Sequence, residues 1–178
     1  VHRIDAETSG LVLVSKNPFS DMVLKNMFEE KLYNKKYKAL VEGEIKKELE
    51  INTPITNDTG LIKIKMKTDI DGKESTTIIR PLSYDKKTNQ TFLEAIPLTG
   101  RQHQIRVHLN SIGHKIIGDP IYGTSEDFTN EFLKNNISDE LRIKTTKSSR
   151  LMLQADYLEF EFLNNIYIFK SMQKIQKT

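Results

Sequence analysis

The sequence has no cysteine among its 178 residues. This absence excludes a disulfide framework, a thiolate nucleophile and the cysteine ligands of a structural zinc site. Three of its four histidines, His2, His108 and His114, are scattered and have no neighbouring cysteine, so they do not form a metal-ligand pattern. We therefore expect no bound metal.

The sequence also lacks long apolar runs. None approaches the roughly 18 consecutive apolar residues that a membrane span requires, and the first residues do not read as a signal peptide. With cysteine absent, this pattern favours a cytoplasmic chain. The net charge is only +3, from 27 basic and 24 acidic residues, which permits a polyanionic partner without identifying one.

The opening segment places one carboxylate, Asp5, just before a turn of small residues, Thr8 to Gly10, and the apolar run 11–14 that follows the turn. A partly desolvated carboxylate keeps its charge beside a cation and can then act as a nucleophile or base. Asp also commonly caps such turns through its side chain. On this segment alone, capping is the more frequent role.

A second segment changes this balance. It reads Leu98-Thr99-Gly100-Arg101-Gln102-His103-Gln104-Ile105-Arg106-Val107-His108-Leu109, and a third segment between the two carries Tyr37 in Lys35-Lys36-Tyr37-Lys38-Ala39-Leu40-Val41. With the opening His-Arg-Ile-Asp-Ala-Glu-Thr-Ser-Gly, these resemble, in order and spacing, the signatures of the RluA-type pseudouridine synthases. Those enzymes isomerise uridine in ribosomal and transfer RNA, and the resemblance extends from Val1 to about Phe162.

The resemblance implies a reaction and the residues that perform it. Asp5 would be the catalytic carboxylate, attacking either the ribose or the uracil ring of a flipped-out uridine, and Arg106 would pair with it. Tyr37 would stack on the uracil and accept a proton, directly or through water. The remaining substrate-binding or RNA-binding residues would be Arg3, Thr8, Arg101 and His103. We place Arg101 beside free backbone amides at a helix start, a position that suits phosphate.

The same resemblance sets the expected partners and domain organisation. It predicts an RNA partner, either rRNA or tRNA, no cofactor, no metal, no membrane contact and a monomer. Residues 1–170 would form the catalytic domain, lacking its N-terminal part, and residues 171–178 a C-terminal tail. The fold class is α+β, with a mixed, mainly antiparallel sheet flanked by a few helices.

Local patterns predict the elements of this fold. We expect a buried strand over 10–16, a helix with Asn17 as N-cap and Pro18 as first residue, and a strand over 31–44 that carries Tyr37. Thr99 and Gln102 have the spacing of a capping box at the start of the next helix. Further strands are expected at 51–55, 61–66, 75–82, 91–95, 150–154, 157–162 and 166–169, with a short helix at 127–133.

Three interpretations stay open from the sequence. The lysines at positions 31, 35, 36 and 38 fit a solvated strand face and RNA phosphate equally well. A non-catalytic RNA-binding module with the same fold would retain the motifs. A hydrolase that uses Asp5 with Glu7 is more remote, because the two carboxylates are unlikely to converge on one point.

Overall fold

The computed structural model describes residues 1–173 and 175. Its main sheet has seven strands in the order β1-β8-β2-β7-β6-β3, with β9 also paired to β8. Only the short β1–β8 pair is parallel, which confirms a mainly antiparallel α+β fold. The strands are β1 (Ser9–Gly10), β2 (Tyr33–Glu42), β3 (Leu49–Asn52), β6 (Thr76–Asp85), β7 (Gln90–Pro97), β8 (Leu153–Phe162) and β9 (Asn165–Lys170); a separate two-stranded sheet pairs β4 (Ile55–Asn57) with β5 (Met66–Thr68).

Three of the helices begin where the sequence supplies a side-chain cap. In α1 (Pro18–Glu29) the Asn17 side chain accepts a hydrogen bond from the Ser20 amide at 2.8 Å, as predicted. Ser125 and Ser138 cap α3 (Glu126–Leu133) and α4 (Asp139–Thr146) in the same way. The fourth helix, α2 (Gln104–Ser111), has no side-chain cap. A cap that satisfies a free amide typically stabilises a helix by about 1 kcal/mol.

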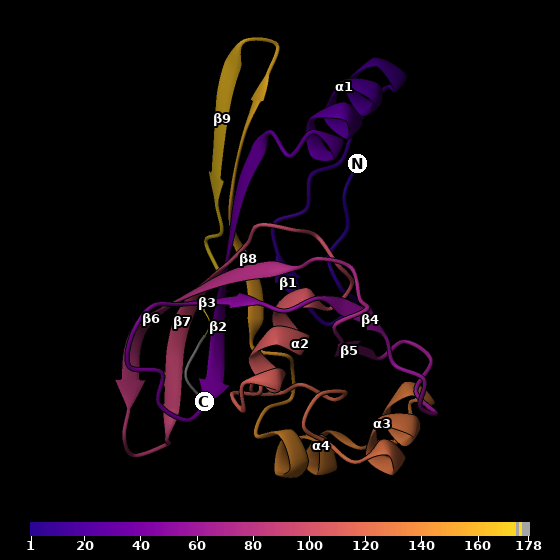
Figure 1. Cartoon of the computed structure of the whole chain (residues 1–178), viewed down its shortest axis with the longest axis vertical. Helices are drawn as coiled ribbons and strands as arrows, with labels where there is room; N and C mark the ends of the chain where they lie inside the picture. The colour runs from indigo at the N-terminus through magenta and orange to yellow at the C-terminus, as the bar shows by residue number, and fades with distance from the viewer. Residues whose placement is uncertain (174, 176–178) are drawn as a thin grey trace.

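The main core lies between α2 and one face of the sheet. Ile105 and Leu109 of α2 join Tyr37, Ala39 and Leu93 in a single buried cluster. Figure 1 shows α2 against the sheet, with α3 and α4 beyond it at one end of the molecule. This packing holds the start of α2 beside the middle of β2, where the predicted site residues converge.

The other end of the molecule is an extension formed by α1 and the β8–β9 hairpin (Figure 1). A second buried cluster, made by Leu24 and Met27 of α1 with Leu158 and Phe160 of β8, packs α1 against the hairpin. Every residue of β9 is exposed, although four of its six side chains are large and apolar. Within the described part of the chain, no helix has the length and apolar character to span a membrane.

Three predicted strands are wrong. The strand expected at 51–55 is divided between β3, which ends at Asn52 in the main sheet, and β4, which begins at Ile55 in the two-stranded sheet. Of the run 10–16 only Gly10, the second residue of β1, is paired with β8, because β9 occupies the rest of that edge of β8; Val12 and Val14 are exposed. Residues 61–65 form a turn, in which the Lys65 amide donates to the Ile62 carbonyl at 3.0 Å, and pairing begins only at Met66.

The C-terminal third also differs from the prediction. The strands expected at 150–154 and 157–162 are one continuous strand, β8. The helix at 127–133 is confirmed within one residue, whereas α4 was not predicted. Part of the expected tail, residues 174 and 176–178, lies outside the described residues. Before it, the Gln154 amide donates to the Ser171 hydroxyl and the Gln173 carbonyl.

Candidate active site

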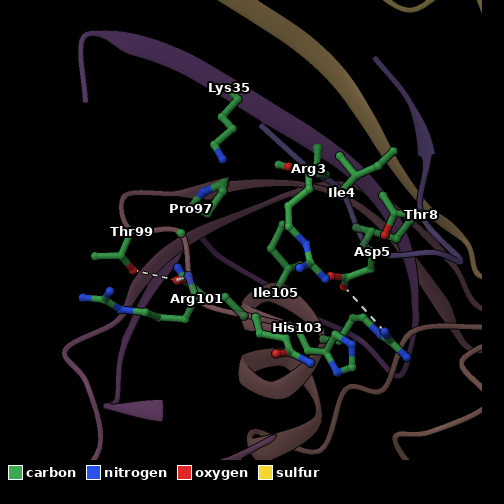
Figure 2. Close-up of a pocket in the computed structure, with 16 residues that line it drawn as sticks. Arg3, Ile4, Asp5, Thr8, Lys35, Pro97, Thr99, Arg101, His103 and Ile105 are labelled. Atoms are coloured by element: carbon green, nitrogen blue, oxygen red, sulfur yellow. Dashed lines mark hydrogen bonds and ion pairs between the residues drawn. The ribbon is translucent and has the colours of Figure 1, made fainter. Parts of the chain in front are cut away.

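Residues from distant parts of the sequence line one cavity of about 200 Å³. Figure 2 shows this pocket between the N-terminal segment, β2 and the start of α2. All seven residues singled out in the sequence contribute to its lining: Arg3, Asp5, Thr8, Tyr37, Arg101, His103 and Arg106. Their roles in a reaction remain predictions, but their convergence is a property of the structure.

Asp5 begins a tight turn that is held against the sheet. The Thr8 amide donates to the Asp5 carbonyl at 2.9 Å, and Thr8 is buried. Gly10 then meets β8 so closely that a Cβ would lie 2.2 Å from the Ala155 carbonyl oxygen, at a φ of +108° that favours glycine. The Asp5 side chain keeps 21% of its surface exposed to the cavity.

Arg106 contacts two carboxylates in different ways. Its Nε and Nη2 each donate to Asp119 at 2.8 Å, whereas Nη1 lies 3.5 Å from Asp5 Oδ2. Burial alone would lower the pKa of Arg106, but the hydrogen bonds and charge of Asp119, with a further contribution from Asp5, outweigh burial and raise the pKa. The predicted Arg106–Asp5 pair is present, but the planar fork of the guanidinium is engaged by Asp119.

Asp119 is a residue of this site that the sequence analysis missed. Its side chain is fully buried and also accepts from the Ile121 and Tyr122 amides at 2.9 and 3.0 Å. The position of Asp119 is fixed by the close approach of the backbone at Gly118 to the backbone at Arg150. A Cβ on Gly118 would lie 1.8 Å from the Arg150 carbonyl oxygen. An isolated carboxylate within the apolar stretch 116–122 is a signal that could have found it, since a buried charge requires a partner.

Tyr37 lies on β2 between small neighbours on both adjacent strands, Ala95 and Ala155. The ring is 8% exposed and faces the cavity. Burial raises the pKa of Tyr37 to about 12, and the negative charge of Asp5 adds to the rise. The phenol therefore stays protonated at neutral pH, which argues against a phenolate base, and no described residue hydrogen-bonds its hydroxyl.

The start of α2 differs from the predicted capping box. The Thr99 hydroxyl donates to the Gln104 side chain at 2.7 Å, so Gln102 is not its partner, and the helix begins at Gln104. The residue at the N-cap position is His103, which has a left-handed φ of 55°. Arg101 therefore stands before the first turn, and its Nε donates to the Glu74 carbonyl at 3.1 Å.

His103 is buried beside Tyr122, with 2.9 Å between its Nδ1 and the tyrosine hydroxyl oxygen. The two rings are perpendicular. Burial lowers the pKa of His103 to about 4, and the positive charge of Arg106 acts in the same direction, so the imidazole is neutral at physiological pH.

Three cations surround the opening of the cavity. Arg3 and Arg101 are exposed, and Lys35 is half-buried and extends toward the pocket in Figure 2. No acidic side chain in the described residues lies within ion-pair distance of any of the three. Lys35 therefore differs from Lys36 and Lys38, which contact Glu94 at 4.0 and 3.1 Å.

Glu7 is turned away from Asp5. It pairs with Arg142 of α4, whose guanidinium also lies over the Phe132 ring. Glu7 does not line the cavity, so the structure does not bring the two carboxylates of the hydrolase alternative together. In residues 1–173 and 175, no group of three His, Asp or Glu side chains is arranged to hold a metal ion.

The chain resembles known proteins over most of its length. A family model described as RNA pseudouridylate synthase matches residues 1–111. An uncharacterized RNA pseudouridine synthase of Helicobacter pylori is 40% identical over 169 residues, which is 93% of this chain and 54% of that protein. The dual-specificity RNA pseudouridine synthase RluA of Vibrio parahaemolyticus is 37% identical over 130 residues, covering 71% of this chain and 52% of that protein.

A solved structure agrees with the fold. Human RNA pseudouridylate synthase domain containing 1 superposes with a TM-score of 0.79 over 97% of this chain and 67% of that chain, at 24% identity. At this identity the likeness concerns the fold alone. The chain spans about half the length of the curated relatives described above.

Proposed function

Since this chain belongs to the RNA pseudouridylate synthase family, and to its RluA type, we propose that it isomerises specific uridines in structured RNA to pseudouridine. The observation that carries the proposal is the convergence of Asp5, Tyr37 and Arg106 on one cavity. Asp5 is the one carboxylate of this cavity that remains partly exposed while a buried cation holds it.

The reaction needs no redox partner and no cofactor. The bond between uracil N1 and ribose C1′ breaks, the base rotates, and C5 bonds to C1′; C5 then loses its proton and N1 gains one. Asp5 acts at C1′ or at the uracil ring, and both routes use its carboxylate. Arg106 orients the carboxylate through a single contact to Oδ2 at 3.5 Å, which leaves the carboxylate available as a nucleophile.

Binding requires the uridine to leave its stack, which costs a few kcal/mol. Tyr37 offers a ring face for stacking on the uracil, a contact worth about 1–3 kcal/mol per base. Arg3, Lys35 and Arg101 around the opening supply charge for the flanking phosphates. His103 and Thr8 complete the walls of the cavity.

The test measures tritium released from carbon five of uridine in RNA transcripts incubated with the purified chain. We expect Asp5→Asn, which keeps the shape and removes the charge, to lower the single-turnover rate by at least about 10³-fold. RNA affinity should stay within about threefold, because the surrounding cations are untouched. A chain that binds RNA but releases no tritium, or an Asp5→Asn variant with full activity, would support the non-catalytic RNA-binding module instead.

The proposal also concerns the class of RNA that carries the modified uridine. The name of one relative, the ribosomal large subunit pseudouridine synthase C of Rickettsia bellii, supports rRNA as a substrate class; tRNA is the alternative that the resemblance of the sequence motifs to RluA-type enzymes adds. We place the protein with those RNAs in the cytoplasm, acting as a monomer without metal. Comparing pseudouridine maps of rRNA and tRNA from strains with and without the gene would identify the site; unchanged maps would contradict this choice of substrate.

A further inference from the structure

The Tyr122 hydroxyl connects three segments beneath the cavity. It accepts a hydrogen bond from the Met66 amide of β5 at 3.0 Å, and it lies 2.9 Å from His103 Nδ1. Tyr122 is 2% exposed, and its ring also packs under the Arg106 guanidinium, 5.1 Å from the ring centroid. The hydroxyl is therefore fixed in position by its neighbours.

This geometry decides which nitrogen of His103 carries the proton. A hydroxyl has one hydrogen to donate, and its oxygen here already accepts from the Met66 amide. If the imidazole proton were on Nδ1, the Tyr122 hydrogen would have no acceptor among the described residues. A buried donor without a partner costs about 1–3 kcal/mol. The favoured arrangement has Tyr122 donating to an unprotonated Nδ1, which leaves the proton on Nε2.

Because Nδ1 of His103 is occupied by the Tyr122 hydroxyl, Nε2 is the ring nitrogen that remains available to a substrate in the cavity. The ring lines the cavity beside Asp5, and Nε2 has no hydrogen-bond partner in the described part of the chain. We propose that His103 contacts the flipped-out nucleotide by donating its Nε2–H to one of the nucleotide's oxygen atoms, and that Tyr122 is the positioning residue that fixes this tautomer. The inference rests on the function proposed above and adds a directional contact to it.

A neutral donor suits this place better than another cation. Asp5 already has Arg106 at 3.5 Å, and a second positive charge beside it would weaken the carboxylate as a nucleophile. The neutral imidazole supplies direction without that charge. Its low pKa, about 4, agrees with this assignment, because His103 remains neutral throughout the neutral range.

The tautomer can be observed directly, without any activity assay. In protein labelled with ¹⁵N-histidine, long-range proton–nitrogen correlation spectra distinguish a protonated ring nitrogen from an unprotonated one. With His103 assigned through its backbone resonances, we expect a protonated Nε2 and an unprotonated Nδ1. Tyr122→Phe, which keeps the ring under Arg106, should shift the population toward a protonated Nδ1. A protonated Nδ1 in the unsubstituted chain would overturn the assignment.

A matched pair of substitutions tests the contact with the nucleotide. The amide nitrogen of His103→Gln reaches the place of Nε2, whereas His103→Asn retains only a group near Nδ1. We expect the single-turnover rate to fall about 100-fold for Asn, the usual effect of removing one donor at a reacting centre, and only about 10-fold for Gln. The reverse order would mean that His103 serves only Tyr122.

The two experiments separate two kinds of failure. If the chain proves inactive on RNA, the spectra still report the tautomer that Tyr122 imposes. If the chain is active but the Asn variant equals or exceeds the Gln variant, the proposed function stands and the contact through Nε2 is refuted. Thermal midpoints of both variants, compared with that of the unsubstituted chain, exclude a difference caused by unfolding.

Discussion

The cavity has two sides that are held in different ways. On the buried side His103 and Arg106 line the cavity, and Tyr122 and Asp119 hold them from behind through hydrogen bonds at 2.8–2.9 Å; we call these four residues the wall. The charged rim is formed by Arg3, Lys35 and Arg101, which make no ion pair among the described residues. The wall is therefore complete without a ligand, whereas the rim has unused charge.

Asp5 lies between these two sides and shares a property with each. Like the wall, it contacts Arg106; like the rim, it stays partly exposed. Asp119, on the same arginine, has both oxygens engaged at 2.8 Å and no exposed surface. Two carboxylates on one guanidinium thus differ in availability, and this difference suggests that Asp119 fixes the geometry while Asp5 reacts.

The largest effect is expected for Asp119→Asn, which tests whether Asp119 fixes the geometry of the wall. Removing one partner of a buried ion pair leaves an uncompensated charge and typically costs about 3–5 kcal/mol. We expect urea denaturation to show a decrease of this size in the free energy of unfolding, together with a large fall in turnover, because Arg106 no longer has the partner that orients it.

The matched control is Asp69→Asn, which alters a partly exposed carboxylate that pairs with Lys67 at 2.9 Å. Surface pairs contribute little to stability, so we expect almost no change in the denaturation midpoint. If the two variants were equally stable, Asp119 would not hold the wall in the way described.

Substitutions in the rim should change RNA affinity and leave the turnover rate unchanged. For Lys35→Gln and Arg101→Gln we expect weaker RNA binding. The slope of log affinity against log salt should fall by about 1 for each phosphate that the protein no longer neutralises. The single-turnover rate at saturating RNA should remain close to that of the unsubstituted chain. Filter binding at several salt concentrations measures the slope.

Lys86→Gln is the control for the rim. Lys86 is exposed in the turn between β6 and β7, at the opposite end of β7 from Pro97, which lines the cavity. Its substitution should leave the salt slope unchanged. An equal effect from Lys86 would mean that RNA binding reflects the overall charge of the chain and not the rim.

The sequence alone indicates much of this site. The motif residues Asp5, Tyr37 and Arg106 could be named because their order and spacing along the chain are specific. Asp119 could be noticed as a carboxylate within an apolar stretch, but it could not be assigned to Arg106, because that contact depends on a loop that returns to Arg106 from 13 residues away. Lys35 could not be separated from Lys36 and Lys38, because only the positions of Glu94 and the cavity distinguish them.

The fold was predicted where one segment determines its own structure. Asn17 and Pro18 define the start of α1 by local chemistry. The apolar run 10–16 has the composition of a strand, but whether it pairs depends on β9, more than 150 residues later, which takes the available edge of β8. Competition between distant segments for one strand edge cannot be read from either segment alone.

The smallest expected effect concerns acid. Burial lowers the pKa of His2 and His103 to about 4 each, below the ordinary value of 6.5. Between pH 6.5 and 4 the unfolded chain then binds more protons than the folded one, so stability is fully present above pH 6.5 and falls as the pH decreases toward 4. We expect a decrease of about 1 kcal/mol in the free energy of unfolding for each histidine, well below the value that the full pKa shift would give.

Substitutions should show how much of this pH dependence of stability comes from the wall and how much from the remainder of the chain. His103→Gln should remove the contribution of the wall from the difference in unfolding free energy between pH 7 and pH 5, while His2 continues to contribute. Arg101→Gln, on the rim, should leave that difference unchanged, because a guanidinium does not titrate in this range. An Arg101 variant that flattened the pH dependence as much as His103→Gln would show that the charge of the rim, and not burial in the wall, keeps the imidazole neutral.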